Sequence, residues 1–308
     1  MIALSEIEAA RRRLAGTIVR TPLVRLQHDG GAEIVLKLEN LQPIGSFKLR
    51  GAGNALAVAD PAELSAGLWT ASAGNMAQAV AWHARERGLS CTAVVPDTAP
   101  RIKLDAIERL GAEVEKVPFA TWLKVFSTRS HPGMYGFFVH PFSDPAVMAG
   151  NGTIGLEIAE DLPGAGAVLI PYGGGGLSCG IASALRALAP RCKVYACEVE
   201  TAPPLAASLA AGEPVEVDHE PSFVDGIGAP TVFPEMFALA REVLDGSLVV
   251  GLDDVAAAIR LLVERSRVVA EGAGAAPVAA ALRRTGKIVC VVSGGNIDTS
   301  TLREILQG

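Results

Sequence analysis

Four consecutive glycines between an expected strand and an expected helix form the strongest chemical signal in the sequence. They follow the apolar segment 167–171, precede a helical segment over 177–188, and are Gly173, Gly174, Gly175 and Gly176. Glycine lets neighbouring backbone N–H groups converge, and a helix N-terminus adds partial positive charge, so this loop suits a phosphate group. The spacing matches neither G-x-G-x-x-G nor G-K-[ST], which favours a single phosphate over a dinucleotide or a triphosphate. A tight turn that binds nothing is the alternative.

Three other short segments carry groups that could line a ligand-binding crevice together with the glycine loop. In Ser46-Phe47-Lys48 the lysine amine lies beside an aromatic ring, and such an amine can form a Schiff base once burial has desolvated it. The alternative, which is the commoner case, is a lysine on the surface. Ser72-Ala73-Gly74-Asn75 opens a helix expected over 75–87 and can hold a carboxylate, or can be an ordinary helix cap. Ser293-Gly294-Gly295-Asn296 leaves the last expected strand at its carboxyl end, where the ligands of open α/β sheets collect.

Apolar runs that are typical of buried parallel strands alternate with helical segments along the chain. The expected strands are 34–38, 68–71, 91–95, 113–117, 137–139, 167–171, 193–199 and 288–292, and the expected helices include 75–87, 101–110, 178–188, 253–266 and 275–284. Continuous apolar strands separated by helices indicate parallel sheets that are covered on both faces. We therefore expect an α/β fold with two open, doubly wound domains, each with three αβα layers.

Two further segments carry local predictions. Ser5 and Glu8 have the spacing of a capping box, which predicts that their side chains bind the first backbone N–H groups of an N-terminal helix. The segment 212–233 has no clear periodicity, and a loop of that length in a compact domain is usually functional.

The composition is that of a globular protein and narrows the class of partner. Of the 308 residues 50% are apolar, and 27 basic against 33 acidic side chains give a net charge of −6. This balance, without a basic cluster, argues against nucleic acid as a partner, and no apolar run is long enough to span a membrane. The five cysteines contain no C-x-x-C pair, which favours a cytoplasmic protein with reduced thiols. There is no G-x-S-x-G hydrolase motif and no H-E-x-x-H motif.

In this order the motifs resemble the fold type II pyridoxal-phosphate enzymes, specifically the threonine/serine dehydratase and serine racemase group. The matching segments are Thr21-Pro22-Leu23, Ser46 to Ala52, Ser72 to Asn75, His140-Pro141-Phe142, Ala149 to Thr153, the four glycines, Glu271 to Ala276 and Ser293 to Asn296. The resemblance implies a fold like that of the tryptophan synthase β-chain. It also implies a large pyridoxal-phosphate-binding domain of residues 1–44 plus 146–308, and a small mobile domain of residues 45–145.

The resemblance also assigns roles to individual residues. It implies that Lys48 forms the Schiff base with pyridoxal phosphate and then removes the substrate's α-proton. Phe47 would lie against the pyridine ring, and Leu177 would join the four glycines around the phosphate. Asn75 would bond the ring hydroxyl, and Ser293 the pyridine nitrogen. The residues that would line the site for the substrate carboxylate are Ser72, Ala73, Gly74 and Met76.

The sequence departs from the family pattern at several places. Met76 stands where the family usually has His, Tyr172 precedes the four glycines, and the segment 119–136 lacks the usual pattern. In family members that are activated by a divalent cation, the register places ligands at Glu198, Ala202 and Pro204. Because Pro204 offers no carboxylate, we expect weak or no divalent activation, with a monovalent ion at Glu198 as the remaining option.

The resemblance implies an ammonia-lyase that converts an L-β-hydroxy amino acid, such as threonine or serine, into a 2-oxo acid and ammonia by β-elimination. The alternatives are an amino-acid racemase or epimerase, a dehydratase for hydroxyaspartate or an aryl-serine, and a phosphate-binding protein without chemistry. Racemases of this type have a second base, a serine, at the position of Ala73, so the alanine favours elimination. The expected partners are a small amino-acid substrate and a second copy of the chain in a homodimer.

Overall fold

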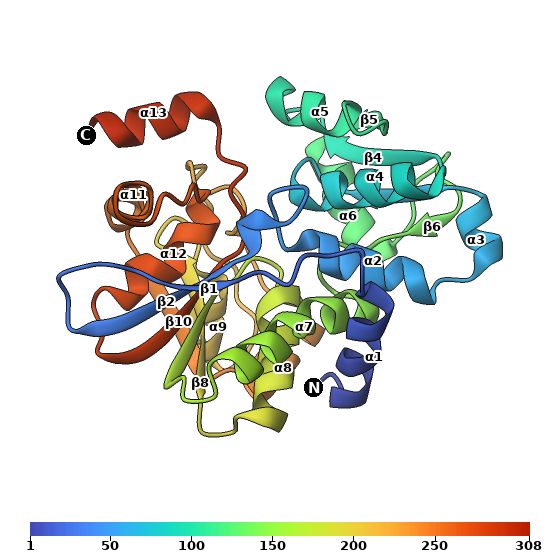
Figure 1. Ribbon diagram of the computed structural model, residues 1–308. Coiled ribbons are helices and arrows are strands. Elements are labelled where there is room, and N and C mark those ends of the chain that lie inside the picture. Colours follow the sequence, from blue (N-terminus) through green and yellow to red (C-terminus); the bar gives the residue numbers. More distant parts are fainter.

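Ten strands form two separate sheets in the computed structural model, which describes all residues from Met1 to Gly308 (Figure 1). The larger sheet has the order β1-β2-β10-β7-β8-β9, and only β1 is antiparallel to its neighbour. Its strands are β1 (Leu23–Arg25), β2 (Ala32–Leu38), β7 (Ala167–Pro171), β8 (Lys193–Val199), β9 (Gly246–Val250) and β10 (Gly286–Val292). The predicted α/β class is confirmed.

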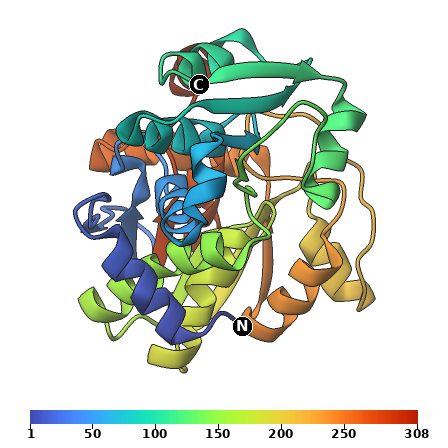
Figure 2. The same cartoon turned by 90° about the vertical axis from the view of Figure 1, so that its right-hand side faces the viewer.

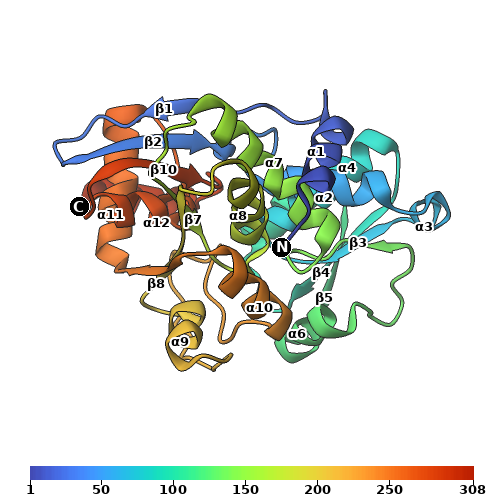
Figure 3. The same ribbon diagram turned by 90° about the horizontal axis from the view of Figure 1, so that it is seen from below.

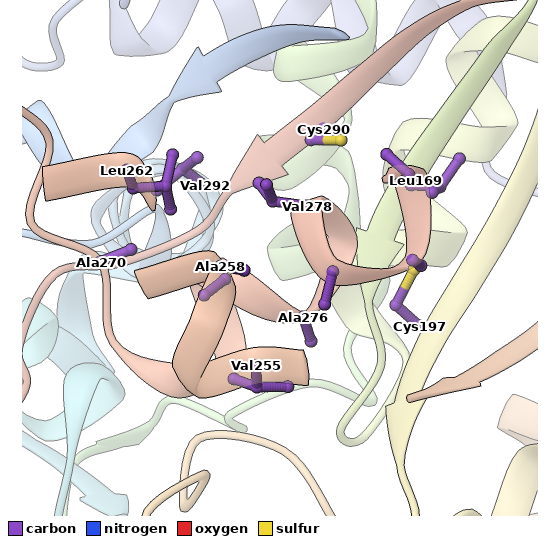
Figure 4. Packing of buried hydrophobic residues seen from close by; sticks show 14 of the residues in the cluster. Leu169, Cys197, Val255, Ala258, Leu262, Ala270, Ala276, Val278, Cys290 and Val292 are labelled. Carbon is purple, nitrogen blue, oxygen red and sulfur yellow. The ribbon is translucent and has the colours of Figure 1, made fainter. Parts of the chain in front are cut away.

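Both faces of the six-stranded sheet are covered by helices, and β10 shows why the sequence requires this. Its side chains alternate, so that Ile288, Cys290 and Val292 pack against α11 (Leu252–Leu261) and α12 (Gly272–Ala281) (Figure 4). Val289 and Val291 face the other way, toward α7 (Pro145–Asp161), α8 (Gly176–Leu188) and α10 (Pro234–Val243). A strand that is apolar at every position must be buried on both faces.

The smaller sheet is parallel throughout and has the order β5-β4-β3-β6. Its strands are β3 (Leu68–Ala71), β4 (Cys91–Pro96), β5 (Glu113–Val117) and β6 (Phe137–Phe138). One face packs on α2 (Lys48–Val58), α4 (Asn75–Arg87) and α5 (Arg101–Glu108), and the other on α6 (Phe119–Thr128). Every strand of this sheet comes from within residues 45–145, but the predicted domain boundaries themselves stay a prediction.

Six further helical segments complete the chain. They are α1 (Leu4–Leu14), the 3-10 turn η1 (Glu39–Leu41), α3 (Pro61–Ser65), α9 (Pro204–Ala211), the π-helical turn η2 (Leu262–Ser266) and α13 (Thr299–Gln307). None of the helices has both the length and the apolar character needed to cross a lipid bilayer.

The predicted capping box at the N-terminus is wrong. Helix α1 begins at Leu4, its N-cap residue is Ala3, and no side chain caps it. Ser5 therefore already lies inside the first turn, where its hydroxyl cannot serve as an N-cap. The register is set by burial instead, because Ile7, Ala10 and Leu14 form the buried stripe of this helix.

The segment 212–233 is a loop, as its lack of periodicity predicts. It connects α9 to α10 and, yellow to orange in Figure 2, runs along the side of the molecule toward the four-stranded sheet. Asp225 in this loop forms an ion pair with Lys103 of α5, so the loop contacts the helices of the other sheet.

Helix α7 lies between the six-stranded sheet and α2, as Figures 1 and 3 show. The two helices can approach closely because Gly150 has no side chain. A Cβ at this position would lie 2.4 Å from the carbonyl oxygen of Arg50. This close approach fixes the position of α2, which begins at Lys48.

A buried network of charges ties α2 to the six-stranded sheet. The Arg50 guanidinium donates through Nε to Glu39 at 2.8 Å and through Nη1 to Glu157 of α7 at 2.7 Å. Lys37 of β2 donates to the same Glu157 carboxylate at 2.5 Å. Burial opposes ionisation of Arg50 and of Glu39, but their mutual attraction outweighs it, raising the pKa of Arg50 and lowering that of Glu39. Arg50 and Glu39 are therefore both ionised in the folded protein.

We expect Arg50→Ala to lower the free energy of unfolding by about 3–5 kcal/mol, because two buried carboxylates lose their partner. The matched control is Arg20→Ala, whose half-exposed side chain pairs with Glu160 and Asp161 and whose loss costs at most about 1 kcal/mol. Urea denaturation measures both, and equal effects of the two substitutions would contradict this account of the network.

Candidate active site

A cavity of about 280 Å³ lies where elements of the two sheets meet. The predicted residues that line it are Phe47, Lys48, Ser72, Ala73, Gly74, Asn75, Met76, Gly173, Gly174, Gly175, Gly176, Leu177 and Ser293. The lining thus combines the lysine, both small-residue loops and the glycine run in one place. Glu198 and Ala202 are not part of the lining.

Lys48 is the first residue of α2 and presents its amine to the cavity. Its Nζ donates a hydrogen bond to the carbonyl oxygen of Pro141 at 2.6 Å and lies 5.1 Å from the centre of the Phe47 ring. Burial lowers the pKa of Lys48 to about 8, although the negative charge of Glu271 opposes the shift. About a tenth of this amine is therefore uncharged at pH 7, far more than for a lysine with an ordinary pKa, and able to act as a nucleophile or a base.

The glycine run forms a loop between β7 and the start of α8 at Gly176. Gly175 has φ +86°, in the region that favours glycine, and a Cβ on Gly174 would lie 2.2 Å from Cγ of Phe142. The backbone N–H groups of Gly173, Gly174 and Gly175 donate to no acceptor in the protein. Unpaired amides at a helix N-terminus are the donors that a phosphate group requires.

A second set of free amides faces the same cavity from the loop between β3 and α4. The N–H groups of Ala73, Asn75 and Met76 have no acceptor in the protein, whereas that of Gly74 donates to Ser72 Oγ at 3.2 Å. This loop also ends at a helix N-terminus, so it suits a second and smaller anion such as a carboxylate.

The Asn75 side chain belongs to a chain of hydrogen bonds at the cavity wall. Its Nδ2 donates to Glu271 Oε1 at 2.8 Å, and its Oδ1 accepts from Asn296 Nδ2 at 2.7 Å. Burial, assisted by the charge of Asp225, raises the pKa of Glu271 to about 7. Glu271 therefore changes its charge near neutral pH, within the cavity that contains the Lys48 amine.

Ser293 follows the last residue of β10 and is joined to the Lys48 segment through the backbone. The N–H of Phe47 donates to the carbonyl oxygen of Ser293 at 2.9 Å, and Ser46 pairs with Gly294 in an isolated antiparallel bridge. The Ser293 hydroxyl makes no hydrogen bond within the protein and lines the cavity. It is therefore free to bind a ligand.

Several lining residues were not predicted as site residues from the sequence. The resemblance places Glu271 at the start of a matching segment without giving it a role. An acidic residue directly before the Gly-Ala helix α12 is nevertheless a sequence feature that indicates a site residue. Lys103, Asp225 and Trp122 come from three separate elements, and only the fold brings them together.

Glu198 has a structural role in the folded chain. Its carboxylate accepts hydrogen bonds from the N–H groups of Leu205 and Ala206, at 2.8 Å each, and from Ser247 Oγ at 2.6 Å. These bonds anchor the start of α9. The metal site predicted at Glu198 and Ala202 remains a prediction; no group of three or more His, Cys, Asp or Glu side chains is arranged to hold a metal ion.

Comparisons with known proteins agree with this geometry. The model of the family described as "Pyridoxal-phosphate dependent enzyme" matches residues 14–294. The L-threonine ammonia-lyase of Thermotoga maritima is 41% identical over 315 residues, which cover 99% of this chain and 78% of that protein.

Two solved structures show the same architecture. The processed form of threonine deaminase isoform 2 from Solanum lycopersicum superposes with a TM-score of 0.87 at 33% identity, over 99% of this chain and 91% of that one. Serine racemase from Dictyostelium discoideum gives a TM-score of 0.85 at 33% identity, over 96% and 99% of the two chains.

The raised pKa of Glu271 predicts a specific dependence of stability on pH. Between about pH 4.5 and 7 the unfolded chain has this carboxyl ionised, whereas the folded protein keeps it protonated, so stability falls as the pH rises. The contribution is about 1.4 kcal/mol per pH unit across that window. Glu271→Gln should remove it, and Glu213→Gln, at an exposed position, should not. Urea denaturation at several pH values tests this; identical slopes for wild type and Glu271→Gln would refute it.

Proposed function

Since the chain belongs to the family of pyridoxal-phosphate-dependent enzymes, we propose that it is an ammonia-lyase acting on an L-β-hydroxy amino acid such as threonine. The family match confirms the cofactor and the family predicted from the sequence.

In the proposed reaction the Cα–H and Cβ–O bonds break and water leaves. The resulting enamine takes up water and releases ammonia, giving a 2-oxo acid. The observation that carries the proposal is the buried Lys48 amine, which shares one cavity with two sets of unpaired amides.

The cavity fits pyridoxal phosphate on the features of the chain itself. The free N–H groups of Gly173, Gly174 and Gly175 would hold the phosphate, and Leu177 would lie beside it. The unpaired Ser293 hydroxyl would bind the pyridine nitrogen. When bound, the cofactor supplies an electron sink for the negative charge that develops at Cα.

Each remaining residue has a proposed part in the reaction. The Lys48 amine attaches the cofactor and later takes the proton from Cα, for which its pKa of about 8 is well suited. Phe47 lies beside that amine and would contact the ring, and Asn75 would bond the ring hydroxyl. The residues proposed to hold the substrate carboxylate are Ser72, Ala73, Gly74 and Met76, mainly through the free amides of their loop.

The main alternative on this scaffold is racemisation, since serine racemase is among the similar structures. Racemisation requires a base on each face of the planar carbanion. Lys48 can serve one face, but Ala73 offers only a methyl group where a second base is expected. Elimination is therefore favoured.

The proposal extends to domain movement, assembly and location. We propose that residues 45–145 move as a unit over the cavity, with the Lys103–Asp225 ion pair holding the closed arrangement. We also propose that the protein forms a homodimer and that it is located in the cytoplasm. The latter is supported by five cysteines that are all buried and unpaired, as is usual in a reducing compartment.

Lys48→Ala should keep the fold but lose the covalently attached cofactor and lower the turnover of L-threonine by about a thousandfold or more. Lys116→Ala, at an exposed position on β5, is the matched control and should remain fully active. The measurements are 2-oxo acid release and the cofactor's absorbance. Turnover of Lys48→Ala at the wild-type rate would exclude the proposed function.

Ala73→Ser should introduce a hydroxyl on the face opposite Lys48 and raise the amount of D-enantiomer formed from L-serine or L-threonine. The wild type should give mainly 2-oxo acid and little D-amino acid. Chiral chromatography alongside a 2-oxo acid assay measures the two products. If the wild type accumulates the D-enantiomer faster than the 2-oxo acid, the protein is a racemase.

A further inference from the structure

One wall of the cavity is apolar, and part of it comes from the segment 119–136, which lacks the family pattern. Trp122 of α6 lines the cavity, as do Met76 of α4 and Phe142. None of these side chains ionises. The indole Nε1 of Trp122 is buried and has no hydrogen-bond partner, so the atoms that this ring exposes to the cavity are carbons.

The position of Trp122 is fixed by neighbouring aromatic rings. Phe126 packs edge-on against it, with ring centres 4.7 Å apart and an interplanar angle of 76°, and the centre of the Phe119 ring lies 5.7 Å from that of Trp122. Phe126 in turn lies 5.8 Å from Phe142, whose ring lies directly against Gly174. Aromatic rings thus pack against one another from the glycine loop to Trp122, and this packing fixes the position of the Trp122 ring.

The charged groups at the cavity leave no free cation for an acidic substrate side chain. Lys103 is paired with Asp225, so these two charges neutralise each other. The Lys48 amine is required for chemistry, and Glu271 is an acid. A second carboxylate on the substrate would therefore gain no unpaired positive charge here.

Resting on the function proposed above, we infer that Trp122 is a specificity-determining residue that contacts the substituent on the substrate's β-carbon. The wall selects β-hydroxy amino acids with an apolar β-substituent, such as the methyl group of threonine. Serine, which lacks that group, and β-hydroxyaspartate, which carries a charge there, are disfavoured. A single methyl group in an apolar pocket gives about tenfold discrimination or more.

The test compares kcat/KM of the holoenzyme for L-threonine, L-serine and threo-3-hydroxyaspartate. The wild type should prefer threonine to serine by about tenfold or more, and hydroxyaspartate should be the poorest of the three. Trp122→Ala should reduce the threonine-to-serine ratio by about fivefold or more by lowering the value for threonine. Trp122→Phe should keep most of the ratio. Leu123→Ala, at an exposed position on the same helix and outside the cavity lining, is the matched control and should keep all of it.

A binding measurement separates this inference from the proposed function. L-2-Aminobutyrate and L-alanine differ by the same methyl group and have no β-hydroxyl to eliminate. Calorimetry on the wild-type holoenzyme should show tighter binding of aminobutyrate, with the difference lost in Trp122→Ala. If no 2-oxo acid forms but this binding difference appears, the role of Trp122 stands and the proposed lyase function falls.

Two outcomes overturn the inference about Trp122. One is a threonine-to-serine ratio and a binding difference that are unchanged in Trp122→Ala while 2-oxo acid is still released. The other is hydroxyaspartate as the best substrate of the wild type. If Trp122→Ala does not fold, as judged by circular dichroism, Trp122→Val is measured against the same criteria.

Discussion

The desolvated amine of Lys48 is the feature on which the rest of the site depends. A lysine on the surface is almost entirely protonated near neutral pH, whereas burial here lowers the pKa to about 8. The fold must hold that amine in place while opposing its natural tendency to reach water. It does so through a short backbone link from Phe47 to Ser293 and through Arg50, which is anchored two residues further along the same helix among buried carboxylates. The buried ion pairs thus fix the start of α2, and the position of the amine follows from it.

Glu271, the second titratable group of the cavity, has a pKa close to that of Lys48. Burial raises its pKa to about 7, so near neutral pH both the amine and the carboxyl exist partly in their uncharged forms. The hydrogen bond from Asn75 to Glu271 links this carboxyl to the loop that carries the second set of free amides. A change of charge at Glu271 therefore acts on Asn75 as well as on Lys48. The cavity combines groups that tune proton transfer with neutral N–H donors that hold anions.

The sequence was sufficient to predict the fold class and many of the residues that line the cavity, because apolar strands and small-residue loops are local patterns. Continuous apolar strands require two covered faces, and loops of small residues at helix starts leave amides unpaired. The capping box at Ser5 failed because tertiary burial of Ile7, Ala10 and Leu14 set the helix start, not the local cap. Glu271, Lys103 and Trp122 were not predicted as site residues, since they share a cavity with Lys48 only through the tertiary arrangement of α2, α5, α6 and α12. The contacts of Lys103 and Trp122 are properties of the folded chain, and no spacing in the sequence encodes them.

The most direct test of the central claim is to locate the covalently bound cofactor. The purified protein is reduced with borohydride, digested, and analysed by peptide mass spectrometry. The account predicts a phosphopyridoxyl group on Lys48, since its amine is desolvated and lines the same cavity as the glycine loop, whereas Lys37, whose side chain is fully buried, is ion-paired to Glu157. A phosphopyridoxyl group on Lys103, on Lys37 or on no lysine at all would contradict it.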